Sequence, residues 1–295
     1  KRKWAYHRET FGKTNPLFRV QIKILSPLWG YENLPIHLFL DRVKDAGYDG
    51  LDTWIPENYD DKKKLFDYVQ HYGMTLVVHQ YRAQGSTFKA FKASFLKNLH
   101  ECAEPDPVLI NSHTGRDWFS LKQQLELIDV AQDFSEKTGI TVVHETHRGR
   151  LGFAPQLANE LFERREDYKI TADLSHWTCV TESMLENFEQ IVEQAIRRTR
   201  HVHARIGHEN GPQVPDPRAP EWSYALDIFL GWWDRIVALN LQLGHAQLTF
   251  TTEFGPPPYM PTIPFVNTPV ADQFEINCYI KNLLKDRYAF LPDQV

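Results

Sequence analysis

The chain has 295 residues, with 33 Lys and Arg against 38 Asp and Glu, so its formal net charge is −5. Because 42% of the residues are hydrophobic and 24% are charged, a disordered or fibrous protein is excluded, and the acidic balance disfavours a protein that binds the nucleic-acid backbone. The three cysteines form no CxxC pair and are too few for a disulfide framework, and no apolar run approaches the roughly 20 residues of a membrane span.

Short apolar or β-branched runs alternate along the chain with longer segments of helical period. The short runs predict strands at residues 20–25, 50–54, 75–79, 108–112, 141–145, 169–173, 201–205 and 247–253. The longer segments predict helices at residues 36–46, 61–72, 88–102, 121–137, 155–164, 182–198, 224–239 and 270–284.

Eight strand–helix units in a chain of this length predict an α/β fold, a closed parallel (β/α)₈ TIM barrel, with a doubly wound open sheet as the alternative. We expect residues 1–295 to form a single barrel domain, with residues 1–18 as a possible N-terminal extension. The few unpaired cysteines favour a reducing, cytoplasmic location. Because the first residue is Lys1 and not Met, a removed leader remains an alternative.

Acidic and imidazole side chains gather at the ends of the predicted strands. Glu145, Asp173, His203 and Glu253 end or nearly end the last four strands, and His79 and His113 end or follow the third and fourth. The carboxyl ends of the strands of a barrel ring one face, so we expect these side chains to lie close together. Buried carboxylates repel one another unless a cation balances them.

Three carboxylates and one imidazole make a hard, oxygen-rich ligand set. Such a set suits one divalent metal ion, Mn²⁺, Mg²⁺, Co²⁺ or Zn²⁺. We therefore predict Glu145, Asp173, His203 and Glu253 as metal ligands; the alternative is that they cap helices or pair with arginines. Aromatic residues that end or follow strands could form the wall of a sugar pocket, with packing at the top of the barrel as the alternative; they are Trp29, Trp54, Trp118, Trp177 and Phe254.

Four stretches carry a resemblance to a known superfamily: HETHRGR (144–150), ADLSHW (172–177), HVHARIGH (201–208) and TTEFGPPPY (251–259). With the strand order, they resemble the xylose-isomerase-like TIM barrels, and within these the sugar phosphate isomerase/epimerase group. The resemblance implies the same four metal ligands, with His201 as an alternative to His203. It also implies proton transfer by Glu145 and Glu253 through an enediolate.

Several residues are expected to bind the substrate, a small carbohydrate. The resemblance implies His176, from the DxxH spacing that begins at Asp173, and Arg205 is expected to hold a substrate oxygen. His79, His113 and Trp54 complete the predicted substrate-binding set. We expect no nucleic-acid or membrane partner and a possible homo-oligomer.

Three other functions are weighed against a keto-sugar isomerase or epimerase. A lyase or dehydratase acting on a keto-polyol would use the same site, and a non-catalytic sugar-binding barrel would need none of its chemistry. An endonuclease IV-like zinc nuclease would use the same histidines and carboxylates in a three-zinc cluster. That family has an Asp-x-His pair after the seventh strand, where this chain has Asp216–Pro217–Arg218.

Overall fold

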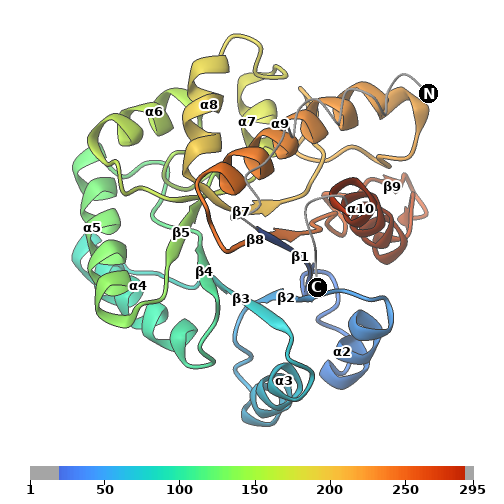
Figure 1. The fold of residues 1–295 in the computed structure, drawn as a ribbon, viewed down its shortest axis with the longest axis horizontal. Helices are drawn as coiled ribbons and strands as arrows, with labels where there is room; N and C mark the ends of the chain where they lie inside the picture. Colours follow the sequence, from blue (N-terminus) through green and yellow to red (C-terminus); the bar gives the residue numbers. More distant parts are fainter. Residues whose placement is uncertain (1–19, 290–295) are drawn as a thin grey trace.

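The computed structural model describes residues 20–289, so the N-terminal extension predicted at residues 1–18 lies outside the described residues. Eight parallel strands pair in chain order and close into a barrel (Figure 1), because β1 pairs with β8 from Gln21↔Gln247 to Leu25↔Thr251. The closed barrel predicted from the sequence is thereby confirmed, and the open sheet is excluded. The strands are β1 (Gln21–Pro27), β2 (Gly50–Thr53), β3 (Thr75–Gln80), β4 (Leu109–Ser112), β5 (Val142–Glu145), β6 (Ile170–Ala172), β7 (Thr199–His203) and β8 (Gln247–Thr251).

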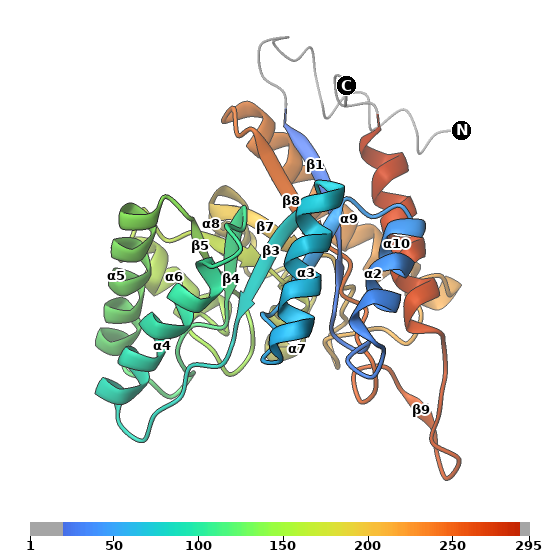
Figure 2. The same cartoon turned by 90° about the horizontal axis from the view of Figure 1, so that it is seen from below.

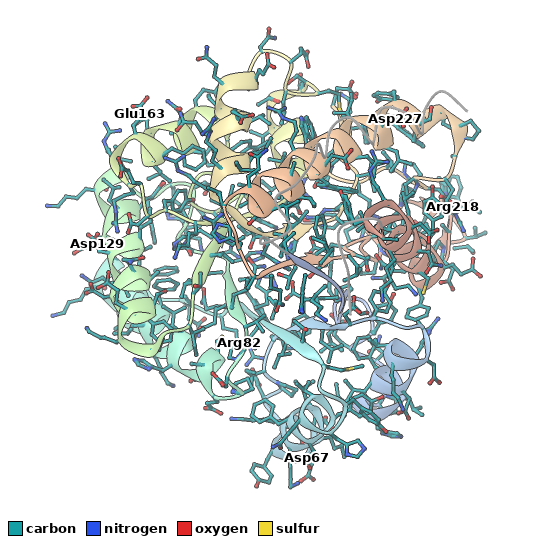
Figure 3. All side chains as sticks on the ribbon, viewed as in Figure 1. Asp67, Arg82, Asp129, Glu163, Arg218 and Asp227 are labelled. Carbon is teal, nitrogen blue, oxygen red and sulfur yellow. The ribbon has the colours of Figure 1, made fainter. Side chains whose placement is uncertain are left out.

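Helices surround the barrel as an outer ring (Figure 1). They are α2 (Ile36–Asp45), α3 (Tyr59–Tyr72), α4 (Phe88–Ala103), α5 (Leu121–Thr138), α6 (Pro155–Arg164), α7 (Leu174–Thr181), α8 (Glu189–Arg198), α9 (Ser223–Gln242) and α10 (Gln273–Tyr288), with a short 3₁₀ helix η1 (Pro220–Trp222) before α9. Charged side chains such as Asp67, Asp129 and Glu163 point outward from this ring (Figure 3). Among residues 20–289, no helix has the length and apolar character that crossing a membrane requires.

Because side chains alternate along each strand, one set faces the helices and the other faces the inside of the barrel. Outward-facing strand residues such as Leu51, Ile110 and Val202 belong to the large apolar cluster between strands and helices. The inward-facing residues Leu25, Val77, Leu109 and Val143 form a separate small cluster inside the barrel. Further toward the carboxyl ends of the strands, the inward positions are polar, which places the polar chemistry of the chain inside the barrel.

Three predicted elements need correction. The helix predicted at residues 182–198 begins only with α8 at Glu189, because Glu182 adopts a left-handed conformation with φ 47° at the end of α7, a helix that the sequence analysis did not predict. The strand predicted at residues 169–173 stops at Ala172, because Asp173 instead accepts the hydrogen bond that caps α7. The helix predicted from residue 270 begins at Gln273, and a small antiparallel hairpin precedes it, formed by β9 (Thr262–Ile263) and β10 (Thr268–Pro269), which projects from the barrel (Figure 2).

Candidate metal centre

The four predicted metal ligands come from four consecutive strand–helix units. Glu145 is the last residue of β5 and His203 the last of β7, while Asp173 directly follows β6 and Glu253 lies just beyond β8. Each side chain offers one ligand atom, and the four atoms lie within 4.8 Å of one another. All four residues are buried. The barrel therefore brings together the whole predicted ligand set.

The contacts inside this group fit a cation. His203 Nδ1 lies 2.7 Å from Glu253 Oε2 and 3.6 Å from Glu145 Oε1. Neither His203 Nδ1 nor Glu253 Oε2 has a hydrogen bond of good geometry to any described residue. Buried polar atoms without partners cost free energy, and a divalent cation among them would satisfy both atoms and offset the repulsion of the carboxylates. The residues thus fit a divalent metal ion.

The pKa values of His203 and Glu145 indicate which charge balances the carboxylates when no metal ion is bound. Burial alone would lower the pKa of His203, but the carboxylates of Glu253 and Glu145 hold it well above its usual value. Burial would raise the pKa of Glu145, but the imidazoles of His113 and His203 hold it well below its usual value. A proton on His203 therefore serves as the counter-charge that a metal ion would replace.

Asp173 is fixed by hydrogen bonds from two sides. As the N-cap of α7, it accepts through Oδ1 from the Ser175 backbone N at 3.1 Å and from the Ser175 hydroxyl at 2.5 Å. Its Oδ2 accepts from the Arg205 guanidinium, whose Nη2 also lies 3.4 Å from Glu253 Oε2. Burial raises the pKa of Asp173 to about 6, against the opposing charge of Arg205. Arg205 therefore neutralises part of the carboxylate charge.

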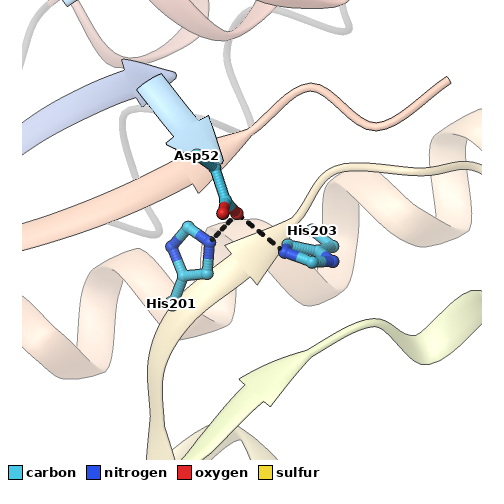
Figure 4. Close-up of side chains that lie close together, drawn as sticks. All are labelled: Asp52, His201 and His203. Atoms are coloured by element: carbon cyan, nitrogen blue, oxygen red, sulfur yellow. Dashed lines mark hydrogen bonds and ion pairs between the residues drawn. The ribbon is translucent and has the colours of Figure 1, made fainter. Parts of the chain in front are cut away.

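Asp52 of β2 belongs to the site, although the sequence analysis did not include it. Its Oδ2 lies 3.1 Å from Nε2 of both His201 and His203 (Figure 4) and accepts a hydrogen bond from the Thr251 hydroxyl at 2.9 Å. A carboxylate only accepts, so each imidazole donates its Nε2–H. Without a metal, the proton on the remaining nitrogen of His203, Nδ1, faces Glu253. With an ion bound, that proton would be lost and Nδ1 would carry the lone pair that a metal ligand requires.

His201 lies deeper in the barrel and takes a different role. Its Nδ1 is 2.6 Å from the Thr249 hydroxyl, and its Nε2 is engaged by Asp52. Both of its ring nitrogens therefore have partners. His203, and not His201, shares the group with Glu145, Asp173 and Glu253.

Asn111 of β4 connects the group to its surroundings. It is fully buried, its Nδ2 donates to Glu145 Oε2 at 3.0 Å, and its Oδ1 accepts from the Thr171 hydroxyl at 2.7 Å. The same Glu145 oxygen lies 3.1 Å from His113 Nε2 and 3.7 Å from His79 Nε2. Glu145 Oε2 is therefore held by neighbours, which leaves Oε1 facing His203.

A cavity of about 440 Å³ opens above this centre, within the range of small-molecule pockets. Of the predicted site residues, Trp54, His79, His113, Arg205 and Glu253 line it. Trp29, from the predicted aromatic wall, lines it as well. The other lining residues, which the sequence analysis did not assign to substrate, are Glu32, Tyr81, His147 and Tyr259. Aromatic rings and polar groups therefore share the wall of one cavity.

Some expected substrate contacts lie elsewhere. His176 is fully buried behind the cavity wall, where its Nε2 is 2.9 Å from Nη2 of Arg205. Trp177 is enclosed and donates to the Gly152 carbonyl at 3.0 Å, and Phe254 is buried in the apolar core. Trp118 is 74% exposed. Of the predicted aromatic wall, only Trp29 and Trp54 line the cavity.

Further groups of titratable residues adjoin the four ligands. His79, His113 and Glu145 form one group with ligand atoms close enough to hold an ion, and Glu145, His147 and His176 form another. The centroid of the His147 ring lies 4.0 Å from that of the His176 ring and 4.4 Å from that of the His113 ring. These buried clusters could thus bind metal as well.

Comparison with solved structures places this architecture among known folds. No protein-family model and no curated protein matches the sequence. The structure is similar to that of 3-keto-D-glucoside 4-epimerase from E. coli, with a TM-score of 0.57 and 13% identity over 90% of this chain and 100% of that one. It is also similar to the "probable 3-DHS dehydratase" of petrobactin synthesis from Bacillus anthracis, with a TM-score of 0.57 and 13% identity over 90% and 99% of the two chains.

Endonuclease IV from Thermus thermophilus shares the same architecture, with a TM-score of 0.54 and 12% identity over 92% of this chain and 99% of that one. These similarities show that the chain shares the (β/α)₈ TIM barrel fold of the three structures. Because identities near this level accompany an epimerase, a dehydratase and a nuclease, the fold alone does not select the reaction.

Proposed function

We propose that this chain is a divalent-metal-dependent isomerase or epimerase of a keto sugar or a related polyol. One observation carries the proposal: the buried group of Glu145, Asp173, His203 and Glu253 meets an aromatic cavity at Glu253. A metal-competent set of carboxylates beside a sugar-sized, aromatic space is what proton transfer next to a carbonyl needs.

The residues divide the work as follows. Glu145, Asp173, His203 and Glu253 would hold the ion, which when bound would supply Lewis-acid polarisation of neighbouring carbonyl and hydroxyl oxygens. Glu253 lines the cavity, so its carboxylate takes the proton from the carbon next to the carbonyl. For isomerisation, the same carboxyl group returns that proton to the neighbouring carbon. For epimerisation, Glu145 takes up a proton from solvent and delivers it to the opposite face of the carbon, while Glu253 releases its proton to solvent, so that both residues end as carboxylates.

Other side chains position the substrate. Arg205 lines the cavity and is held by the Ser175 hydroxyl at 3.1 Å from its Nε, so it presents a fixed guanidinium to the carbonyl oxygen. His79 and His113 line the opposite part of the wall beside Glu145 and donate to hydroxyl groups. His176 acts through Arg205, which it contacts, and not on the substrate itself.

The nuclease alternative is disfavoured by Asp216. Its carboxylate accepts from the Arg218 backbone N at 2.9 Å, and its two oxygens accept from Nε at 2.9 and 3.1 Å and from Nη2 at 2.7 Å. These hydrogen bonds engage the carboxylate that a zinc nuclease of this fold would use as a metal ligand. A dehydratase would begin with the same proton removal and would differ by losing a hydroxyl group as water.

Hydrogen exchange in D₂O tests the proposal. The Mn²⁺-loaded protein is incubated with a panel of ketoses and keto-inositols, and NMR follows deuterium at the α-carbon together with the products. We expect exchange with an epimer or isomer as product, and its loss in Glu145→Gln and Glu253→Gln but not in the surface control Glu160→Gln. Exchange that survives both active-site substitutions contradicts the acid–base roles, and an unsaturated product would indicate the dehydratase.

A further inference from the structure

The charges around the cavity select among the substrates that the proposed function allows. Arg205 is the single Lys or Arg among the described residues that line the cavity. Its guanidinium is already ion-paired with Asp173 and lies 4.9 Å from the centroid of the Tyr259 ring and 5.8 Å from that of Trp29. Its charge is therefore compensated before any substrate arrives.

A carboxylate lines the cavity on the side of β1. Glu32 lines it and accepts a hydrogen bond from the Gly30 backbone N at 3.0 Å. Glu32 is exposed, and within residues 20–289 it forms no ion pair. A divalent ion and Arg205 together balance the carboxylates of Glu145, Asp173 and Glu253, so the carboxylates of Asp52 and Glu32 leave the site with a net negative charge. An anionic group on the substrate would be repelled there.

Two arginines that contact the aromatic rings of the wall do not themselves line the cavity. The Arg148 guanidinium lies 5.2 Å from the centroid of the Tyr259 ring, and its Nη1 contacts Cys179 Sγ at 3.7 Å. Arg82 lies 5.6 Å from the Tyr81 ring centroid and pairs with Glu57 at 3.6 Å. Neither lines the cavity.

The apolar part of the wall consists of two aromatic pairs. Trp29 and Tyr259 meet edge to face with centroids 5.0 Å apart, and Trp54 and Tyr81 meet in the same way at 5.7 Å. Such rings offer apolar surface to the C–H groups of a sugar or cyclitol ring, and they gain nothing from a charged group. Aromatic contact and negative potential therefore favour the same kind of ligand.

We propose that the cavity takes an uncharged carbohydrate or cyclitol and discriminates against phosphorylated and carboxylated ones. The inference rests on the proposed function for the identity of the site, but it concerns binding and is measured without turnover. It excludes a sugar phosphate as the substrate.

Calorimetric titration of the Mn²⁺-loaded protein tests the inference. The probes are D-fructose, D-tagatose and a keto-inositol, each against a phosphorylated counterpart such as D-fructose 6-phosphate. We expect at least one uncharged probe to bind about tenfold or more tightly than its phosphate. If the phosphates bind as tightly as the uncharged probes or more tightly, the inference is overturned. If neither set binds, the assignment of the cavity to carbohydrates is overturned.

Three variants identify the cause of the discrimination. Glu32→Gln should reduce the preference by several-fold, because the Kd of the phosphorylated probe falls by more than that of the uncharged one. Trp54→Ala should weaken the uncharged probe about tenfold, since stacking on one ring is lost, whereas Trp118→Ala, at an exposed tryptophan outside the cavity, should not. An unchanged preference in Glu32→Gln contradicts the electrostatic argument. Tight binding of an uncharged sugar without hydrogen exchange would refute the proposed function and leave this inference intact.

Discussion

Replacement of Asp52 by Asn tests how the metal centre is held. The substitution keeps the size of the side chain but removes the charge that accepts Nε2–H from both His201 and His203 at 3.1 Å. Burial would raise the pKa of Asp52, but the hydrogen bonds from these two imidazoles hold it well below its usual range. Asp52 is therefore a carboxylate, and the substitution exchanges an ionic acceptor for a neutral amide.

The magnitude follows from the place of Asp52 behind the ligand. Loss of a carboxylate that orients a metal-bound histidine typically lowers metal affinity about 10–100-fold, which is about 1.4–2.7 kcal/mol. An asparagine amide can also donate to His203 Nε2, which would move the ring proton to Nδ1 and block the ligand atom. We therefore expect Asp52→Asn to weaken Mn²⁺ binding by at least tenfold.

The assay is calorimetric titration of the chelator-stripped protein with Mn²⁺, repeated with Co²⁺ so that the absorption spectrum reports the ligand set. The control is Asp216→Asn, because Asp216 pairs with Arg218 near the surface and should not affect the ion. Circular dichroism melting confirms that the variant is folded. A folded Asp52→Asn protein that binds Mn²⁺ within twofold of the wild type would refute the reasoning.

Three other predictions concern pH and packing. The pKa of His203 lies well above its usual value and that of Asp173 at about 6, so metal binding should release one proton near neutral pH and approach two below pH 6. The apparent metal affinity should therefore rise about tenfold per pH unit or more. Calorimetry in buffers of different ionisation heat measures the released protons, and a release of none would contradict the prediction. Burial lowers the pKa of His144 to about 3, so the unfolded state binds the proton more readily than the folded state. The free energy of unfolding should therefore fall by up to about 1.4 kcal/mol per pH unit as the pH drops from about 6.5 toward 3. In urea unfolding at pH 7, 6 and 5, His144→Gln should show a weaker dependence of this free energy on pH, and an unchanged dependence would contradict the prediction. A Cβ at Gly50 would lie 1.8 Å from the Thr75 carbonyl oxygen, whereas one at Gly231 meets nothing within 4 Å; Gly50→Ala should therefore destabilise by about 1–3 kcal/mol or more and Gly231→Ala should not, and equal melting temperatures would rule out the close approach.

The barrel and its ligand set were predictable because they depend on local pattern. Each of the eight predicted strands overlaps an observed one, since an apolar run between turn signals is enough to indicate a buried parallel strand. The same period placed Glu145 and His203 at strand ends. The late start of α8 was not predictable in this way, because residues 182–188 have the helical period although Glu182 and Leu185 adopt left-handed conformations.

Asp52 could not be assigned from its own segment. It lies inside a strand predicted at residues 50–54, where an inward carboxylate has no visible partner along the chain. Its partners His201 and His203 are 149 and 151 residues away, and only closure of the barrel brings them together. The signal that could have found it is the rule that an acidic residue inside an apolar strand needs a buried partner. His147, by contrast, was visible in the HETH stretch but not recognised as a cavity residue.

The two halves of the barrel hold different parts of the site. All four ligand candidates follow or end β5 to β8, whereas Trp54, His79 and His113 reach the cavity from β2 to β4. Amino-acid changes in the first half can therefore alter which sugar fits while the ion keeps its ligands, whereas in the second half the lining residues His147, Arg205 and Tyr259 lie among the ligands. Asp52 is the exception, because it links the halves from β2. Laboratory evolution toward new substrates should accordingly accumulate changes in the first half and spare this one aspartate.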